Sequence, residues 1–278
     1  MKYYLTLLLI ITSLVNSAYA QQRDPIPKKQ LSPKKLTVLY DFEFKPDTLD
    51  LQDIVSEPML LQVGDNMSKF ISFWREFGDS LINASDLQTR NEIMRYPGKL
   101  APMPRVHFFI LKDFNNRTIT HHEMILPDFF RYQEDMELFE WTILNETMQW
   151  NTFKLQKATT EFGGRKWIAW FAPDIPISDG PYKFNGLPGL IVNIKDENEH
   201  YSFRVKSISK APENSYVETY KTMRYIDTDR NGFIRAYKNF RQDILNRANN
   251  AEIKNPEALQ RIARNIERNN NPLELDFY

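Results

Sequence analysis

The most informative stretch of this chain is residues 180–191, which read Gly180-Pro181-Tyr182-Lys183-Phe184-Asn185-Gly186-Leu187-Pro188-Gly189-Leu190-Ile191. Glycine and proline interrupt an apolar run. Glycine permits backbone conformations and close approaches that a Cβ atom would block, and proline fixes φ and withholds an N–H donor. The stretch therefore predicts a link that turns sharply, stays out of a central sheet ladder and then enters a strand at Ile191.

The sequence on both sides of this link predicts β-hairpins. Residues 152–162 and 165–171 flank Gly163-Gly164, whose two-residue loop permits the positive φ angles of a type I′ turn. Residues 191–194 and 201–207 form a second hairpin around a polar turn at 196–199. Because hairpins outnumber βαβ spacings, we expect an antiparallel sheet.

Further elements follow from periodicity. Alternating apolar residues predict strands at 36–44, 58–63, 106–111, 118–126 and 138–144, and residues 217–226 read as extended. Ser68 is the expected N-cap of a helix over 69–83, with a continuation to 95. The C-terminal part is helical over 234–247 and 256–268. The expected fold class is α+β and β-dominated: a strongly curved, half-barrel-like antiparallel sheet with one early helix and C-terminal helices packed into its concave side.

The N-terminus predicts export. Lys2 precedes a mostly apolar core over 5–15, and Ala18-Tyr19-Ala20 is a cleavage site of the A-x-A kind, so residues 1–20 read as a signal peptide. The core is shorter than the ~20 apolar residues that span a bilayer. Cleavage leaves Gln21 first, where a lipoprotein needs a cysteine. We expect a periplasmic or secreted protein with no transmembrane segment after cleavage.

The remaining chain reads as one domain. Residues 21–35 contain three prolines and several basic residues and predict a flexible lead-in. Residues 36–278 then form a single domain, with a core motif region at 141–195 and a helical C-terminal part at 230–268. There is no cysteine, which excludes disulfides and thiol chemistry, and 36 basic residues balance 36 acidic ones. This balance argues against a nucleic-acid partner.

The candidate binding residues surround the glycine-rich link: Arg165, Trp167, Trp170, Tyr182, Phe184, Gly186, Pro188 and Gly189. One interpretation is a rigid loop that plugs one end of the curved sheet. The other is a docking loop for a partner, or the floor of an apolar pocket, since ligand sites favour aromatic clefts. Arg165 either grips a carboxylate or phosphate, or lies at the surface stacked on Trp167 or a cross-strand partner.

Two motifs resemble metal sites. Residues 227–234 copy the start of an EF-hand loop, but Lys238 stands where calcium needs a bidentate glutamate. A polar turn in which Asp229 or Asn231 caps the next helix is the expected outcome. In a strand, His121 and Glu123 share one face, as two zinc ligands could, but no third ligand is identifiable and half-exposed strand residues are expected. We predict no metal and no cofactor.

Catalytic signatures are missing from the sequence. There is no G-x-S-x-G, H-E-x-x-H or phosphate-binding loop, and no catalytic residue is assigned. The principal expectation is a non-catalytic binding protein. The alternative is a hydrolase of an envelope or extracellular polymer, whose carboxylates come from several strands.

The chain resembles the GLPGLI family of secreted Bacteroidota proteins. The matching segments lie at 157–160 (KATT), 162–165 (FGGR), 175–176 (IP), 180–184 (GPYKF), 186–191 (GLPGLI) and 271–275 (NPLEL). The resemblance implies an exported accessory or binding protein near TonB-dependent outer-membrane receptors, with such a receptor or a lipid-like ligand as partner. Many members carry a cysteine shortly before the KATT segment, where this chain has Leu155, so a role for that cysteine does not transfer.

Overall fold

The computed structural model describes residues 25–249 and 256–277. The predicted signal peptide and the first residues of the expected lead-in lie outside this range. Within it, thirteen strands form one large sheet in the order β13-β6-β5-β4-β3-β2-β1-β11-β10-β9-β8-β7, with β12 paired to β1. Apart from the short parallel pair of β13 and β6, the pairings are antiparallel.

The strands have the following bounds: β1 (Lys28–Phe44), β2 (Val55–Gly64), β3 (Met67–Ser72), β4 (Phe109–Asp113), β5 (Thr118–Ile125), β6 (Asp128–Asp135), β7 (Thr142–Trp150), β8 (Phe153–Phe162), β9 (Arg165–Ala172), β10 (Leu190–Asp196), β11 (Tyr201–Lys210), β12 (Tyr216–Tyr220) and β13 (Ile226–Asp227). The helices are α2 (Phe73–Ala84), α3 (Leu87–Arg95), α4 (Arg230–Asn249) and α5 (Pro256–Arg268), with a 3₁₀ turn η1 (Leu275–Phe277).

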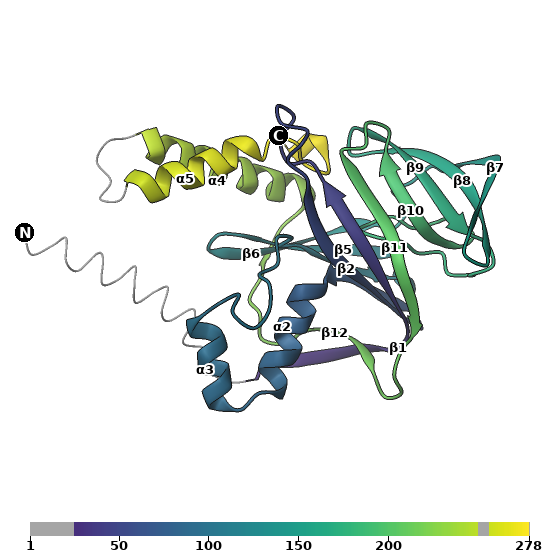
Figure 1. The fold of residues 1–278 in the computed structure, drawn as a ribbon, viewed down its shortest axis with the longest axis horizontal. Coiled ribbons are helices and arrows are strands. Elements are labelled where there is room, and N and C mark those ends of the chain that lie inside the picture. Colours follow the sequence, from purple (N-terminus) through teal and green to yellow (C-terminus); the bar gives the residue numbers. More distant parts are fainter. Residues whose placement is uncertain (1–24, 250–255, 278) are drawn as a thin grey trace, which may run out of the picture.

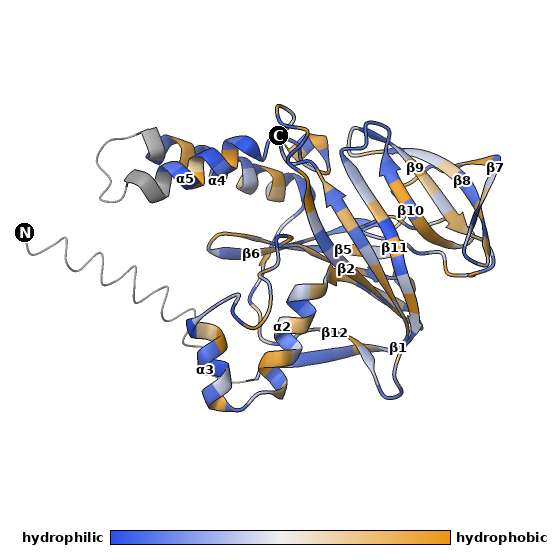
Figure 2. Ribbon diagram, viewed as in Figure 1, coloured by the Kyte–Doolittle hydropathy of each residue, from blue (hydrophilic) through white to orange (hydrophobic). Residues whose placement is uncertain are grey.

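The fold is thus β-dominated and antiparallel, as expected. The sheet is open, because its path ends at β13 on one side and at β7 on the other. Figure 1 shows it bent, with α2 and α3 below and α4 and α5 above β6. Hydrophobic and hydrophilic residues alternate along several strands (Figure 2), as in a sheet with one buried face. In β3 and β4 both faces are buried, and the alternate residues of these strands belong to two different apolar clusters. Among the described helices, none is long and apolar enough to cross a membrane.

Strand β1 is the spine of the sheet. Residues 34–44 pair with β2 on one side, and residues 36–44 pair with β11 on the other. Residues 28–33 pair with β12 instead. The expected flexible lead-in is therefore wrong for residues 28–35, which are strand. The prolines misled the prediction: Pro33 lies opposite Tyr216, close to register shifts in both pairings, where a missing N–H is tolerated.

One face of the sheet carries the main core. Trp167, Phe184 and Phe171 are fully buried, and Phe42 of β1 stacks on Phe203 of β11 with ring centroids 4.3 Å apart. A smaller core joins α4 to β5 and β6 through Phe233 and Tyr132. Large apolar side chains on these faces stabilise a sheet of this size, because each Å² of apolar surface removed from water contributes about 25 cal/mol to the free energy of folding.

The early helix begins later than expected. Residues 67–72 form β3 between β2 and β4, and α2 begins at Phe73 with Ser72 as its N-cap instead of Ser68. The apolar spacing of this segment suits a helix, but both neighbouring strands offer hydrogen bonds. Here tertiary pairing overrides local periodicity. The continuation to 95 is a separate helix, α3, capped by Asp86.

Two other strands differ from expectation. Strand β7 occupies 142–150 rather than 138–144, because Phe139 and Trp141 turn inward and pack on Phe184. Strand β6 was not predicted, since its sequence mixes aromatic and charged residues on both faces. By contrast, both expected hairpins are present, and α5 has the predicted bounds of 256–268.

Candidate functional site

The plug loop, defined as residues 173–189, links β9 to β10 and lies against the inner face of the sheet. Residues 179–185 of this loop are buried. Gly186 has φ +94°, in a region that favours glycine, and an isolated bridge joins Asp179 to Asn185. Phe184 packs edge-to-face on Trp167, with ring centroids 4.8 Å apart. The loop is therefore an internal part of the core.

A buried lysine of β4 fixes the plug loop. Lys112 Nζ donates hydrogen bonds to Asp179 Oδ1 at 2.5 Å, to the Gly180 carbonyl at 2.8 Å and to the Phe184 carbonyl at 2.9 Å. Burial lowers the pKa of Lys112, and the adjacent Asp179 opposes that shift. A charge buried this deeply needs a partner with full hydrogen bonding, and the loop backbone supplies it.

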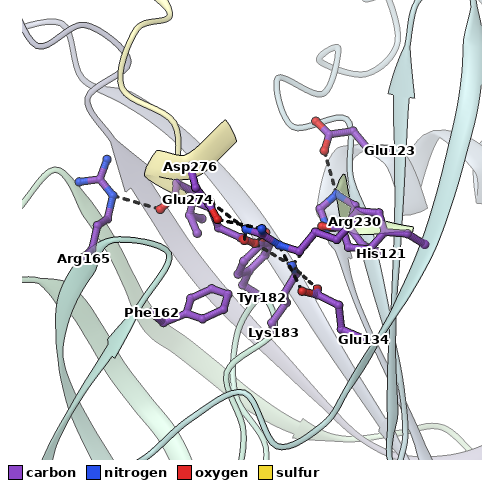
Figure 3. Close-up of polar contacts among 12 residues, drawn as sticks. His121, Glu123, Glu134, Phe162, Arg165, Tyr182, Lys183, Arg230, Glu274 and Asp276 are labelled. Atoms are coloured by element: carbon purple, nitrogen blue, oxygen red, sulfur yellow. Dashed lines mark hydrogen bonds and ion pairs between the residues drawn. The ribbon is translucent and has the colours of Figure 1, made fainter. Parts of the chain in front are cut away.

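The neighbouring loop residue, Lys183, is the centre of a second polar group. We define the Lys183 cluster as Tyr132, Glu134, Tyr182, Lys183, Arg230, Glu274 and Asp276. All of these except Tyr132 are labelled in Figure 3. The Lys183 ammonium is fully buried and lies 2.5 Å from Glu134 and 2.7 Å from Glu274. The Tyr132 hydroxyl accepts a third hydrogen bond from it at 3.1 Å. Four segments meet here: β6, the plug loop, the start of α4 and the C-terminal end.

Glu274 is the fully buried acid of the cluster. It accepts hydrogen bonds from the Tyr182 hydroxyl at 2.5 Å and from Arg230, which also pairs with Asp276 at 2.8 Å. Burial opposes its charge, but Lys183 and Arg230 outweigh this and hold the pKa of Glu274 below its usual value. The carboxylate is therefore ionised at neutral pH.

The C-terminal strap, defined as residues 271–277, brings Glu274 into this position. Arg165, at the start of β9, donates to the backbone carbonyls of Leu273 at 3.0 Å and Pro272 at 2.6 Å. It also binds Asn271 Oδ1 at 2.5 Å, pairs with Asp196 at 3.1 Å and lies over the Tyr201 ring. Arg165 is thus a buried clamp on the strap. Of the two alternatives for this residue, the surface position is wrong, and the carboxylate that it contacts is the internal Asp196.

A histidine–glutamate pair lies beside the cluster. His121 Nε2 is 2.8 Å from Glu123 Oε2, so the two residues share one strand face as predicted. The expectation of half-exposed histidines is wrong, because His121 and His122 are both buried. Burial raises the pKa of Glu123 to about 7 and, together with Lys183, lowers the pKa of His121 well below its usual value. Neutral imidazole and a carboxyl that titrates near neutrality thus share one hydrogen bond.

The predicted binding residues are brought together, but mostly in the interior. Trp167, Tyr182, Phe184 and Gly189 are buried, Trp170 is half-buried, and only Gly186 and Pro188 are exposed. The plugging interpretation of the loop matches this burial. Of the predicted binding residues, the exposed Gly186 and Pro188 are therefore the ones that an external partner can contact directly.

Sequence reasoning missed Lys183, Glu134, Arg230 and Glu274. Lys183 stands among aromatic and glycine residues in the most informative stretch of the chain, and a lysine in such a setting requires an acid partner. That signal was readable. The identity of the partner was not, because Glu274 lies 91 positions further along the chain.

The metal hypotheses receive no support from the geometry. Within the described residues, no three His, Cys, Asp or Glu side chains are grouped as a metal site. Asp227 of the EF-hand-like segment forms a bidentate pair with Arg131 of β6. Asp229 accepts a hydrogen bond from the Gly232 amide at 2.6 Å, the helix-capping role that the sequence predicted.

The described surface has shallow hollows. Four of them have volumes between about 220 and 320 Å³ and mixed polar and apolar linings. One lies over β1, β10 and β11 and is lined by Phe44, Asn193 and Arg204 among others. The charges of the Lys183 cluster are paired internally, so the cluster, as arranged, can hold segments together and accept a carboxylate.

Solved structures resemble this fold. Two crystal forms of PNGF-II, in space groups C2 and P21, match with TM-scores of 0.51 and 0.52 at 11% sequence identity. Each match covers 75% of this chain but only 33% and 34% of the PNGF-II chain, so this chain spans about a third of that protein's length. At this identity the likeness concerns the fold alone.

The sequence comparisons are narrower. The curated proteins contain no significant match to this chain. Residues 133–193, which include Glu134, Lys183 and the whole plug loop, match the model of a family described as "Protein of unknown function (Porph_ging)", and this part of the chain is similar to that family.

Proposed function

We propose that this chain is a non-catalytic, exported envelope protein of the GLPGLI type that binds a protein partner, namely an outer-membrane TonB-dependent receptor. The observation that carries the proposal is the internal position of the motif residues. Their aromatic side chains are buried, and the buried charges are paired inside the fold, as in the Lys112 and Lys183 contacts. A rigid body with a filled interior suits recognition through its outer surface.

The lipid-like ligand is the less favoured partner. Small-molecule sites are typically concave and occupy about 300–1,000 Å³. The four hollows described above have volumes of at most about 320 Å³ and linings that are polar as well as apolar. We propose that the sheet is half-barrel-like and that the plug loop fills its interior. A lipid carrier would need an apolar cavity in that place.

The exposed rim of the plug loop is the proposed contact. Gly186 and Pro188 are the exposed positions within residues 179–190, which are otherwise buried. A rigid loop with an exposed tip loses little conformational entropy when it binds a partner. Pro188→Glu should therefore weaken binding without loss of folding, because the position is solvent-facing.

The test is affinity purification of the full chain from the native envelope in mild detergent, with proteins and lipids identified by mass spectrometry. Stoichiometric recovery of a TonB-dependent receptor, lost in Pro188→Glu and retained in Met103→Glu, supports the proposal. Met103 is 61% exposed and lies in the segment after α3, so it controls for added surface charge. Recovery of the protein alone, or with bound lipid, contradicts it.

One observation favours the hydrolase alternative. Glu123 has a pKa of about 7 and a side chain that is 21% exposed, which are properties of a general acid. The experiment is to incubate the protein with purified peptidoglycan and with extracellular polysaccharide, and to measure new reducing ends. Activity that is abolished in Glu123→Gln supports a hydrolase, and no activity above a buffer blank removes it.

A further inference from the structure

The C-terminal strap, which ends in the 3₁₀ turn η1, is held through its main chain as a bound peptide is held. Its main chain is hydrogen-bonded by side chains of other segments: Arg165 binds two of its carbonyls, and Tyr201 donates to the Asn271 carbonyl at 2.5 Å. Its Leu275 amide donates to the Gly163 carbonyl at 2.7 Å. Main-chain bonds of this kind give affinity, while pockets for individual side chains give specificity.

The turn between β8 and β9 is shaped for the strap. A Cβ on Gly163 would lie 2.9 Å from Glu274 Cγ, and one on Gly164 would lie 3.2 Å from Leu275 Cβ. Both glycines have positive φ, so they satisfy the turn as well. The Gly-Gly pair therefore meets two requirements, the hairpin turn and the close passage of a second backbone.

The pocket for Glu274 is cationic without it. Lys183 and Arg230 supply two positive charges, and the Tyr182 hydroxyl donates a further hydrogen bond. When the strap leaves, Asp276 leaves together with Glu274, and Glu134 of β6 remains as the partner of both cations, 2.5 Å from Lys183 and 3.3 Å from Arg230. The pocket residues thus retain partners while the site lacks its carboxylate.

Apolar side chains complete the recognition. Leu273 packs against the main core, and Phe277 lies edge-to-face on Phe233 of α4, with ring centroids 5.7 Å apart. A peptide that fits this groove therefore needs an acidic side chain, a leucine immediately before it and an aromatic ring three positions after it. The segment Leu273-Glu274-Leu275-Asp276-Phe277 has this pattern.

We infer that the groove between Arg165, the plug loop and α4 is a peptide-binding site, which the chain fills with its own strap and which accepts the same segment from a second copy of the chain in trans. In cis the strap has an effective concentration in the millimolar range, as short tethers give. A trans peptide therefore binds measurably only when the cis strap is weakened. This inference stands independently of the envelope partner proposed above.

The test uses the full mature chain carrying Glu274→Gln and a fluorescent peptide of residues 271–278. Fluorescence anisotropy should show this variant binding the peptide at least tenfold more tightly than the wild type does. A peptide with Gln in place of Glu should bind the variant at least tenfold more weakly than the Glu peptide. Arg165→Lys, added to Glu274→Gln, should weaken binding, because a lysine cannot grip the two carbonyls and Asn271 together.

The matched control is Arg204→Lys in the same Glu274→Gln background. Arg204 lies on the opposite face of the sheet in an exposed pair with Glu43, so peptide binding should not change. If Glu274→Gln does not give a cooperative thermal transition, Leu273→Ala serves as the strap-weakening variant. The inference is overturned if a folded strap variant binds the peptide no better than the wild type, or if the Glu and Gln peptides bind equally.

Discussion

Buried lysines define the chemistry of this chain at the scale of single residues. Lys69, Lys112 and Lys183 are each at most 3% exposed, and each has a carboxylate within 3.0 Å. Moving one such charge out of water costs several kcal/mol. Pairing recovers that cost only when geometry is good, and this makes removal of one partner far more damaging than removal of both.

The Lys112–Asp179 pair allows a direct test. Lys112→Met leaves the fully buried Asp179 without its cation and frees two plug-loop carbonyls. We expect a loss of about 3–5 kcal/mol in the free energy of unfolding, measured by urea denaturation. The double variant with Asp179→Leu should recover part of it.

The control for this prediction is Lys206→Met. That lysine forms an exposed pair with Asp41 at 3.4 Å, and exposed pairs contribute about 0–1 kcal/mol. A Lys112→Met variant as stable as this control would show that the plug loop does not depend on the buried pair.

Glu123 makes stability depend on pH. Its folded pKa is raised from 4.5 to about 7, so between these values the folded protein holds a proton that the unfolded chain has released. The stability of the wild type relative to Glu123→Gln should therefore fall as pH rises from 4.5 to 7, by about 3 kcal/mol at about 1.4 kcal/mol per unit.

The measurement is urea unfolding of both proteins at several pH values. The nearby groups Lys183, Glu274 and His107 are common to both, as are His121 and His122, whose lowered pKa values give stability that is lost as pH falls below 6.5. The difference between the two proteins isolates Glu123. A difference that stays constant with pH would contradict the raised pKa.

The sequence indicated which single residues need a buried or paired environment, but not which residues provide that environment. Aromatic residues around the link were expected to cluster, and Trp167 and Phe184 do. Arg165 was named as a candidate binding residue, yet its contacts with residues 271–273 join positions more than 100 residues apart. No periodicity or spacing rule carries that information.

At the scale of elements, local signals succeeded where turns decide the structure. Gly163-Gly164 closes a hairpin as predicted, with φ angles of +58° and +74°. Prediction failed where a segment could satisfy two patterns. The segment Met67–Ser72 is helical by spacing and strand by pairing, and its neighbours β2 and β4 decided the outcome.

Substitution of glycine by alanine should have opposite effects on stability at the end of the plug loop and within α2. A Cβ on Gly189 would lie 2.2 Å from the Ala172 carbonyl oxygen, a backbone atom that cannot move without disturbing β9. Gly189→Ala should therefore lower the free energy of unfolding by at least about 2 kcal/mol, because overpacking destabilises a close-packed interior. The measurement is the free energy of unfolding in urea.

Gly78→Ala is the matched control. Gly78 lies within α2, and an added Cβ there meets nothing within 4 Å. Alanine in a helix interior is favoured over glycine by about 0.8–1.0 kcal/mol, so this variant should be more stable than the wild type. If Gly189→Ala were equally well tolerated, the close approach of the plug loop to β9 would be wrong.

At the scale of the whole molecule, the β-dominated antiparallel class could be predicted but the strand order could not. Hairpin neighbours such as β8 and β9 follow from turn signals. The pairing of β1 with β11 joins residues about 160 positions apart, and it places the two halves of the chain in one sheet. Closing a loop of that length costs conformational entropy, which the burial of the whole core must offset. No local pattern in the sequence indicates which distant strands will pair.

The strap joins the sheet to the C-terminal helices, so its removal should change how the molecule unfolds. It touches the residue after β1, since Asn271 donates to the Lys45 carbonyl, and it touches β9 through Arg165 and α4 through Arg230. Deleting residues 271–278 leaves the two pocket cations without Glu274 and leaves Phe233 without Phe277. We expect calorimetry to show the single transition of the full chain replaced by two, with the α4–α5 hairpin melting first. For a chain of this size 1 kcal/mol corresponds to about 2–4 °C, so the first transition should fall by at least about 6 °C. One transition within 2 °C of the full chain's midpoint would mean that the sheet and the helical hairpin are coupled through α4 and the second core alone.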